Sequence, residues 1–194
     1  MPEQDLQWRN IETAPRDGRL LLLHDPTLSR WSALLPPQRI ASRDFICVGR
    51  WADAADGMSK AGWVNDQRTP VSSGGTEPDW ILQTPDPVHW CELPAPPPGG
   101  DWLPADRPPP LSCYVLLFDP SLARWREPPM AQPDAAAASM IVGTYAARVH
   151  GRDPDWISDY VEESELVDDP GDFFATPIVL SPAYWMDLPP APQA

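Results

Sequence analysis

The sequence has almost no lysine and few cysteines. Lys60 is the lone lysine, and three cysteines occur among 194 residues. Three is an odd number, and the spacing of Cys47, Cys91 and Cys113 is not that of a metal site, so we expect reduced thiols and a cytoplasmic protein. The longest purely aliphatic run is Leu20 to Leu23. A membrane-spanning helix needs roughly 20 apolar residues, and the N-terminus lacks the pattern of a signal peptide, so we expect no membrane association.

Familiar catalytic signatures are also missing. The chain contains no G-x-S-x-G, H-E-x-x-H, P-loop or C-x-x-C motif. His89 and Cys91 are two residues apart in a strand-like segment, and His24 ends another such segment. A nucleophile and its base must come within hydrogen-bond reach of each other, and side chains two apart on a strand seldom do. We predict structural roles for these three residues, no enzymatic activity, no cofactor and no metal site.

The charge is strongly one-sided, with 28 acidic against 14 basic residues and a net charge of −14. Such a field repels nucleic-acid backbones, so we expect no generic nucleic-acid binding, and it favours basic partners. Residues 1–97 carry nine bases and 13 acids (−4), whereas residues 98–194 carry five and 15 (−10). The excess is concentrated in the stretch 160–174, whose six acids are Glu162, Glu163, Glu165, Asp168, Asp169 and Asp172.

Two interpretations of this acidic stretch remain open. It can be a solvated insert loop, or a surface that binds a basic partner protein. A calcium loop is disfavoured, because the alternating Asp positions and the central Gly of such a loop are absent.

The abundant residue is proline, with 28 copies, which excludes a mainly helical protein because interior prolines break helices. The chain also repeats itself. HDPTLSRW at 24–31 is similar to FDPSLARW at 118–125, and VGRW ending at Trp51 is similar to VGTY ending at Tyr145, both 94 residues apart. Four tryptophan pairs follow nearly the same offset: Trp8 and Trp102, Trp31 and Trp125, Trp63 and Trp156, and Trp90 and Trp185. Collinear matches of this kind indicate a tandem duplication, with units 1–98 and 99–194.

Each unit predicts a small antiparallel sheet of three or four strands, so the fold class is mainly β, with two tandem units related by a pseudo-twofold. The expected strands are 19–25, 45–51, the segment around Trp63, and 87–93, with equivalents at 113–119, 139–147, around Trp156, and 183–188. The D-P-x-L-x-R-W motif predicts a turn after the first strand. Residues 131–140 are the one expected short helix. The two sheets can pack face to face or pair at their edges.

The repeated tryptophans are expected to anchor the core, since each buries a large area. More specifically, the Pro-rich exits LPAPPP and LPPAPQ are expected to lie against the opening Trp of a unit. Trp51 and Trp80 have no tryptophan partner in the second unit and, with Arg50, form a candidate stacking surface for a sugar, base or peptide. Asp17 and Gly18 predict a turn in which Gly takes a positive φ.

The first unit resembles a family of short phage and prophage proteins of unknown function. The matching positions are Trp8, Pro15, Asp17, Gly18, His89, Trp90, Leu93, Pro94, Pro96 and Pro97. The second unit departs from this pattern, with ADRPPPLSCY in place of the P-x-D-G loop and Tyr184 in place of His89. The resemblance implies a phage or mobile-element setting, in the host cytoplasm or on the virion, and no known reaction.

Together these observations predict a non-enzymatic accessory protein that binds a host or virion protein through the acidic surface of the second unit. Two alternatives stay open: a structural capsid or tail component of the virion, and a small-ligand binder with a Trp-lined cleft between the units. The oligomeric state is left open.

Overall fold

The structure is a computed structural model of the whole chain. It describes residues 6–26, 29–31, 39–41, 46–53, 60–65, 68–71, 79–82, 86–111, 113–121, 136–146, 154–165 and 173–192. The elements of the first unit are β1 (Arg9–Asn10), η1 (Ile11–Thr13), β2 (Leu21–His24), β3 (Ser29–Trp31), β4 (Arg39–Ala41), β5 (Ile46–Ala52), β6 (Gly62–Asn65), β7 (Arg68–Val71), β8 (Asp79–Leu82) and β9 (His89–Glu92). Those of the second unit are β10 (Leu103–Pro104), β11 (Tyr114–Phe118), η3 (Ala137–Ser139), β12 (Met140–Ala146), β13 (Asp155–Glu165), β14 (Phe173–Val179) and β15 (Tyr184–Asp187).

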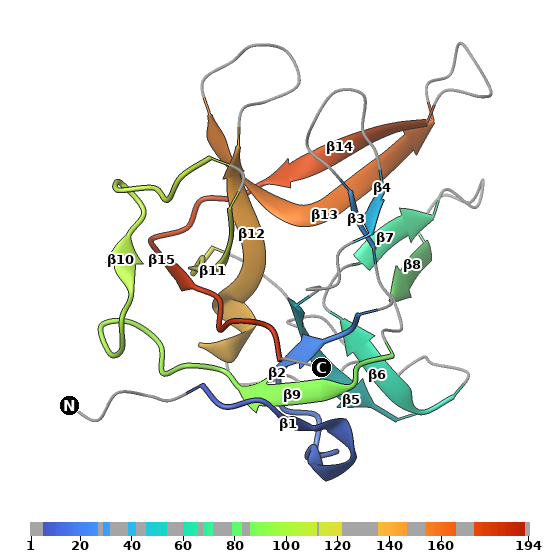
Figure 1. Cartoon of the computed structure of the whole chain (residues 1–194). Helices are drawn as coiled ribbons and strands as arrows, with labels where there is room; N and C mark the ends of the chain where they lie inside the picture. Colours follow the sequence, from blue (N-terminus) through green and yellow to red (C-terminus); the bar gives the residue numbers. More distant parts are fainter. Residues whose placement is uncertain are drawn as a thin grey trace.

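The protein is mainly β, as predicted, and its two antiparallel sheets follow the same order of strands. The first sheet runs β1-β9-β2-β5-β6, and the second runs β10-β15-β11-β12-β13 with β14 added at its edge. Equivalent registers recur, since Leu23 lies opposite Trp90 in the first sheet and Leu117 lies opposite Trp185 in the second. Two hairpins, β3-β4 and β7-β8, lie in segments of the first unit where no strand was expected (Figure 1), and β3 contains the last three residues of the D-P-x-L-x-R-W motif.

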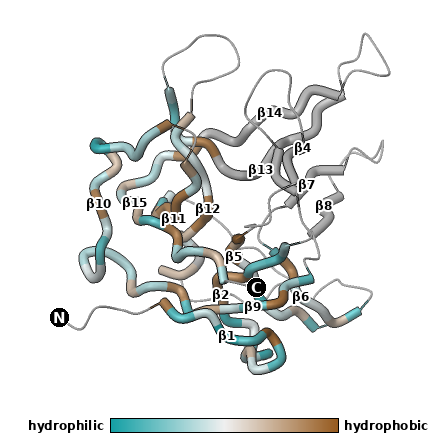
Figure 2. Tube along the Cα trace, viewed as in Figure 1, coloured by the Kyte–Doolittle hydropathy of each residue, from teal (hydrophilic) through white to brown (hydrophobic). Residues whose placement is uncertain are grey.

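The two sheets pack face to face and share one hydrophobic core. Leu22 and Val48 of the first sheet lie in the same buried cluster as Leu116, Val142 and Met186 of the second. Figure 2 shows that the central strands of both sheets carry the hydrophobic residues. Of the two arrangements left open by the sequence, the face-to-face one is present, and each unit completes the core of the other.

The outer face of each sheet is covered by its own unit. Leu21, Leu23 and Cys47 pack with Ala14 and Trp90 under the loop that follows β1. The equivalent cluster in the second sheet contains Val115, Leu117, Trp156, Leu180 and Trp185. Because successive strand residues point to opposite faces, the continuous LLLL and VLL runs supply both faces at once.

Two equivalent glycines allow this packing. A Cβ atom added to Gly49 would lie 2.6 Å from the Val64 carbonyl oxygen and 2.6 Å from Leu23 Cδ1. A Cβ on Gly143 would lie 2.7 Å from the Ile157 oxygen and 2.7 Å from Leu117 Cδ1. The glycine of the repeated V-G pair is therefore required by close approach of the neighbouring strand.

The D-P-x-L-x-R-W motif begins with a buried aspartate that ties two loops together. Asp119 is 1% exposed; its Oδ1 accepts from the Ser121 backbone N–H at 2.9 Å, and its Oδ2 accepts from the Ser181 N–H at 2.7 Å. Asp25 is likewise buried, and its Oδ2 accepts from the Asp86 N–H at 2.6 Å. The expected turn is present at Asp119, and each aspartate also fixes the loop before the last strand of its unit.

The prediction of a helix at 131–140 is wrong for the residues that the structure describes, 136–140. Only Ala137–Ser139 form one 3-10 turn, and Met140 already belongs to β12. The Asp119 backbone N–H donates to the Ser139 carbonyl at 2.8 Å, so pairing with the end of β11 takes this segment into the sheet. Residues 131–135 lie outside the described part of the chain.

Candidate functional site

The acidic stretch is built on the β13-β14 hairpin at the edge of the second sheet. Glu162 lies opposite Thr176, Glu163 opposite Ala175 and Glu165 opposite Phe173. In Figure 1 this hairpin runs out from β12 above the β3-β4 and β7-β8 hairpins of the first unit, and β13 contacts β3 and β7. Asp168, Asp169 and Asp172 lie outside the described residues, as do the side chains of the three glutamates. The sequence between Asp155 and Val179 contains eight acidic residues and no basic one.

Trp51 lies in a small aromatic cluster on the outer side of the first sheet. Its ring meets that of Trp63 edge-to-face, with centroids 5.4 Å apart. The Arg16 guanidinium lies 4.3 Å from the Trp51 ring centroid, within the range of a cation–π contact. The Trp51 indole N–H donates to Asp53 Oδ1 at 3.3 Å. Arg16 rather than Arg50 is therefore the arginine that meets this ring.

Arg50 does not occupy the exposed position that a stacking surface requires. It is 1% exposed, and its Nη1 donates to the Trp51 carbonyl at 3.4 Å. Arg50 faces the shared core by alternation along β5, where its neighbours Val48 and Ala52 are buried, and this placement accounts for its loss of exposure. Trp80 lies in β8 opposite Pro70, and its side chain is outside the described part. Among the described side chains, Trp51 therefore groups with Trp63 and Arg16, and Arg50 does not belong to this group.

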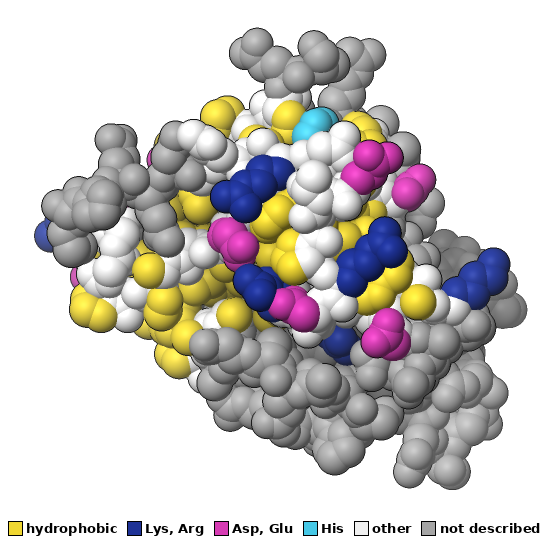
Figure 3. All heavy atoms as spheres, turned by 90° about the horizontal axis from the view of Figure 1, so that it is seen from below, with side chains coloured by type: hydrophobic (Ala, Val, Ile, Leu, Met, Phe, Trp, Pro, Cys, Tyr) yellow, Lys and Arg dark blue, Asp and Glu magenta, His cyan; other side chains and the backbone are white. Residues whose placement is uncertain are grey.

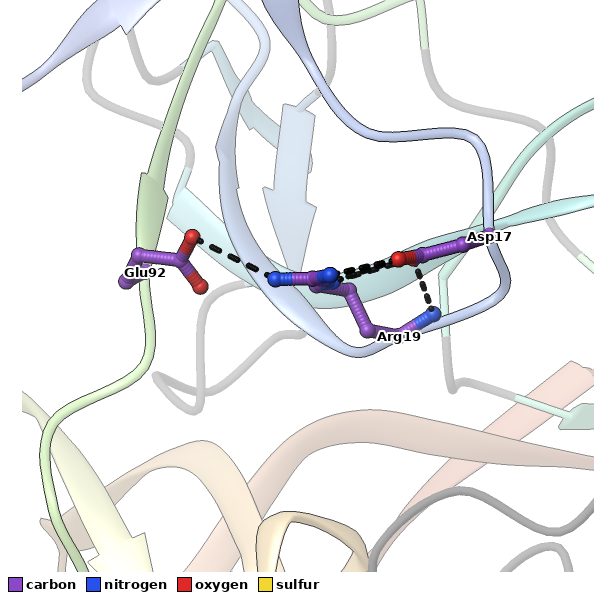
Figure 4. Close-up of polar contacts among 3 residues, drawn as sticks. All are labelled: Asp17, Arg19 and Glu92. Carbon is purple, nitrogen blue, oxygen red and sulfur yellow. Dashed lines mark hydrogen bonds and ion pairs between the residues drawn. The ribbon is translucent and has the colours of Figure 1, made fainter.

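The Asp17-Gly18 turn is formed as predicted, with a φ of 82° at Gly18. Figure 4 shows Arg19 bridging two carboxylates: its Nη2 lies 2.6 Å from Asp17 Oδ2, and its Nη1 lies 3.8 Å from Glu92 Oε1. Hydrogen bonds from Arg19 hold the pKa of Asp17 below its usual value. Figure 3 shows the molecule from below the view of Figure 1, where basic and acidic side chains are interspersed with hydrophobic ones. These exposed ion pairs fix the turn, and each contributes little stability.

The two histidines of the first unit lie against each other. His24 and His89 are opposite one another in the β2-β9 register, and their ring centroids are 5.7 Å apart. Burial and the neighbouring His24 lower the pKa of His89. Burial raises the pKa of the Cys91 thiol to about 12, so this thiol stays protonated at neutral pH. Phe118 and Tyr184 take the equivalent positions in the second unit and are also paired in register.

The opening tryptophan of each unit holds the Pro-rich exit of the other. Trp8 Nε1 donates to the Pro190 carbonyl at 2.7 Å, and Trp102 Nε1 donates to the Ala95 carbonyl at 2.8 Å. The predicted contact between exits and opening tryptophans is present, and the structure adds that the exits are exchanged. We call these two contacts the exit clasps. Either clasp joins segments of both units.

The other repeated tryptophans act as core anchors where they are described. Trp90, Trp156 and Trp185 are buried, and Trp63 is half-buried against the core. Trp90 Nε1 donates to the Asn10 carbonyl at 3.1 Å, and Trp185 Nε1 donates to the Arg107 carbonyl at 2.8 Å. Trp31 has a described backbone only, in β3, and Trp125 lies outside the described residues.

Sequence reasoning missed two arginine contacts, Arg16 with Trp51 and Arg9 with Trp90, the latter at 5.0 Å from the ring centroid. Both arginines come from the segment around η1, and nothing in their spacing indicates which ring each one meets. The sequence did mark Asp25 and Asp119 as structurally important, because both begin the repeated D-P motif. Their burial was not predicted.

The chain matches no protein-family model, no curated protein and no solved structure. In the part of the chain that the structure describes, no helix is long and apolar enough to cross a membrane. The same residues contain no group of three or more His, Cys, Asp or Glu side chains placed to hold a metal ion.

Proposed function

We propose that this chain is a non-enzymatic interaction protein that binds a basic partner protein through its acidic β13-β14 hairpin. One observation carries the proposal: eight acidic residues and no basic one fall between Asp155 and Val179, and five of the eight lie in β13, which pairs with β14 at the edge of a sheet. Pairing with β14 orders the backbone that carries the five acids of β13, whereas an unpaired loop would not.

The physical role of such a surface is steering and selection of a partner. A concentrated negative field accelerates encounter with a basic surface and disfavours acidic competitors. Exposed charges are screened within about 8–10 Å at physiological salt, so this binding weakens as salt is added. The net charge of −14 strengthens the same preference over the whole molecule.

The family resemblance of the first unit supports a phage or prophage setting. In that setting the partner is a host protein, or a virion protein if the chain is a capsid or tail component. The two roles differ in where the protein is found, in the host cytoplasm or on the particle.

The test compares two variants with the same change in charge. The first replaces Glu162, Glu163 and Glu165 with Gln and Asp168, Asp169 and Asp172 with Asn. The control replaces six exposed acids outside the hairpin: Glu12→Gln, Asp53→Asn, Asp86→Asn, Asp101→Asn, Asp106→Asn and Asp187→Asn. Tagged wild type and both variants are incubated with host lysate and with purified particles, at low and at high salt.

We expect a stoichiometric basic partner that wild type and the control variant retain at low salt and that the hairpin variant loses. A partner from the lysate supports the accessory role, whereas one from particles supports the virion role. A partner that the hairpin variant retains, or one that the control variant loses equally, contradicts the proposal.

A further inference from the structure

We propose that Trp8, His24 and His89 form a binding site for an extended proline-rich peptide of a partner protein, and that the chain's own segment Leu188–Pro192 occupies this site as an intramolecular ligand. This site lies in the first unit and is independent of the β13-β14 hairpin.

The site consists of a row of three aromatic rings and one hydrogen-bond donor, the Trp8 indole N–H. Trp8 and His24 have ring centroids 5.9 Å apart, and His24 and His89 follow at 5.7 Å. The Trp8 indole N–H donates to the Pro190 carbonyl at 2.7 Å across 182 positions of the chain. The occupying segment forms neither helix nor strand; its Pro189 is buried, whereas Pro190 is exposed.

This combination is the one that proline-rich segments need from a receptor. Such segments form no internal hydrogen bonds, so their carbonyl groups remain available as acceptors. They are already ordered before binding and lose little conformational entropy, and aromatic-lined grooves recognise them. A tryptophan supplies both the ring that packs on the prolines and the N–H that binds a carbonyl.

The contact occurs a second time, which makes an accidental contact implausible. Trp102 donates to the Ala95 carbonyl at 2.8 Å within the other exit, and its ring lies 6.0 Å from that of Phe118. Trp102 and Phe118 occupy the positions equivalent to Trp8 and His24. The same donor, the same ring order and the same class of segment therefore recur in both units.

The second of these two sites cannot exchange its occupant. The exit that lies on Trp102 is continuous with β9 on one side and β10 on the other, so it is held at both ends. The exit that lies on Trp8 follows β15, and we assign the exchangeable site to this one. The first site also contains a buried ring nitrogen, His89 Nδ1, that makes no hydrogen bond to the described residues.

A tethered segment competes with any external peptide. Its effective concentration is of millimolar order, so we expect wild type to bind a proline-rich peptide weakly. Removing the residues after Leu188 should strengthen binding of the same peptide by about tenfold or more, because the competitor is gone.

The experiment uses a synthetic peptide with the sequence of residues 188–194, LPPAPQA, and a control peptide in which its three prolines are glycines. Calorimetry gives the affinity for wild type and for a chain that ends at Leu188. Spectra of ¹⁵N-labelled indole groups identify which of the ten tryptophan signals moves. If the shortened chain loses its native spectrum, the full-length variant Pro189→Gly/Pro190→Gly, whose exit is more flexible, takes its place.

We expect the opened variant to bind LPPAPQA at least tenfold more tightly than wild type does, with the Trp8 indole signal moving and the Trp102 signal staying in place. Trp8→Phe in the same background should weaken binding about tenfold, whereas Trp102→Phe should not. Equal binding of the glycine peptide, or no binding by either opened variant, would overturn the proposal. If wild type instead forms dimers at high concentration, in which the segment Leu188–Pro192 of one copy binds Trp8 of another, the occupant is a second copy of the chain. That result would overturn the assignment to a partner protein.

Discussion

Trp8 and Pro190 lie 182 positions apart in the chain and share a hydrogen bond of 2.7 Å, and Trp102 and Ala95 repeat this contact at 2.8 Å. Because the two exits are exchanged, the opening of each unit is closed by the end of the other. The exit clasps and the shared core both act to make the two units one cooperative structure.

Replacing either clasp tryptophan with phenylalanine should destabilise the whole protein. Trp8→Phe keeps an aromatic ring but removes the N–H donor and part of the packed ring, so we expect a loss of at least about 0.5–1.5 kcal/mol, the net value of one hydrogen bond. Trp102→Phe should cost a similar amount. Urea unfolding monitored by circular dichroism measures both, with Trp51→Phe as a control that loses the same part of the ring but only a longer hydrogen bond of 3.3 Å. No change for either clasp variant would contradict a stabilising role.

The two units should not fold separately. Leu22, Val48 and Val64 of the first unit lose their packing partners Leu116, Val142 and Met186 when the second unit is removed. We expect fragments 1–98 and 99–194 each to give the poorly dispersed spectrum of an unfolded chain. Mixing the two fragments should restore the native spectrum, because their association rebuilds the shared core. A folded single fragment would show that one unit can bury its core alone.

The sequence could predict the sheets because the repeat marks them twice. RLLLLHD and CYVLLFD each contain a strand, β2 and β11, and V-H-W-C-E-L places Trp90 and Cys91 on opposite faces, as the structure has them. The clasps could be expected from the Pro-rich exits beside the opening tryptophans. The exchange of the exits could not be predicted. An exit that lies against the opening tryptophan of its own unit and one that lies against that of the other unit satisfy the same local sequence pattern.

Other features depend on tertiary structure that no local pattern records. The pairing of β13 with β14 has an equivalent in the β7-β8 hairpin of the first unit, since Val161 lies opposite Pro177 as Arg68 lies opposite Leu82. The paired segments share no residues between the two units, so no repeat signal marks them. Arg50 follows Gly49 in the repeated motif and was predicted to be part of a stacking surface, yet it is buried. Periodicity indicates which residues share a face, but here both faces of the sheet are covered, so it cannot say which polar residue remains exposed.

Gly49→Ala should be strongly destabilising, whereas Gly62→Ala should not. The new methyl group at residue 49 meets the Val64 backbone oxygen at 2.6 Å, and a backbone atom cannot rotate away. We expect a cost of about 2–3 kcal/mol, in the range of an overpacked core. No atom lies within 4 Å of a Cβ at Gly62, and alanine is favoured over glycine within a strand. Thermal unfolding of both variants makes the comparison, and equal effects would contradict the close approach of β5 and β6.

The three cysteines should differ sharply in reactivity. Cys113 is exposed, whereas Cys47 and Cys91 are buried. The pKa of Cys91 is raised to about 12 by burial, and only a thiolate reacts readily. With a thiol-specific reagent at neutral pH, mass spectrometry should find one label on the native protein, at Cys113, and three after unfolding in urea. Rapid native labelling of Cys91 would contradict its burial in the shared core.

The histidine pair should make stability depend on pH. Burial and His24 lower the pKa of His89 below its ordinary value of 6.5 in the folded protein, so the unfolded chain takes up a proton first as the pH falls. Stability is therefore fully present above about pH 6.5 and decreases below it until the folded pKa is reached. The melting temperature Tm, measured as a function of pH, reports this decrease.

Three variants test the role of the histidine pair. His89→Tyr copies the Tyr184 of the second unit and should reduce the decrease in Tm at low pH. His24→Phe, which copies Phe118, should also reduce it, because the pKa of His89 then moves back toward 6.5. Tyr184→Phe serves as a control and should leave the slope unchanged. The comparison is the change in Tm between about pH 7.5 and pH 5.5. If wild type and His89→Tyr show the same change, the histidine pair does not cause the dependence of stability on pH.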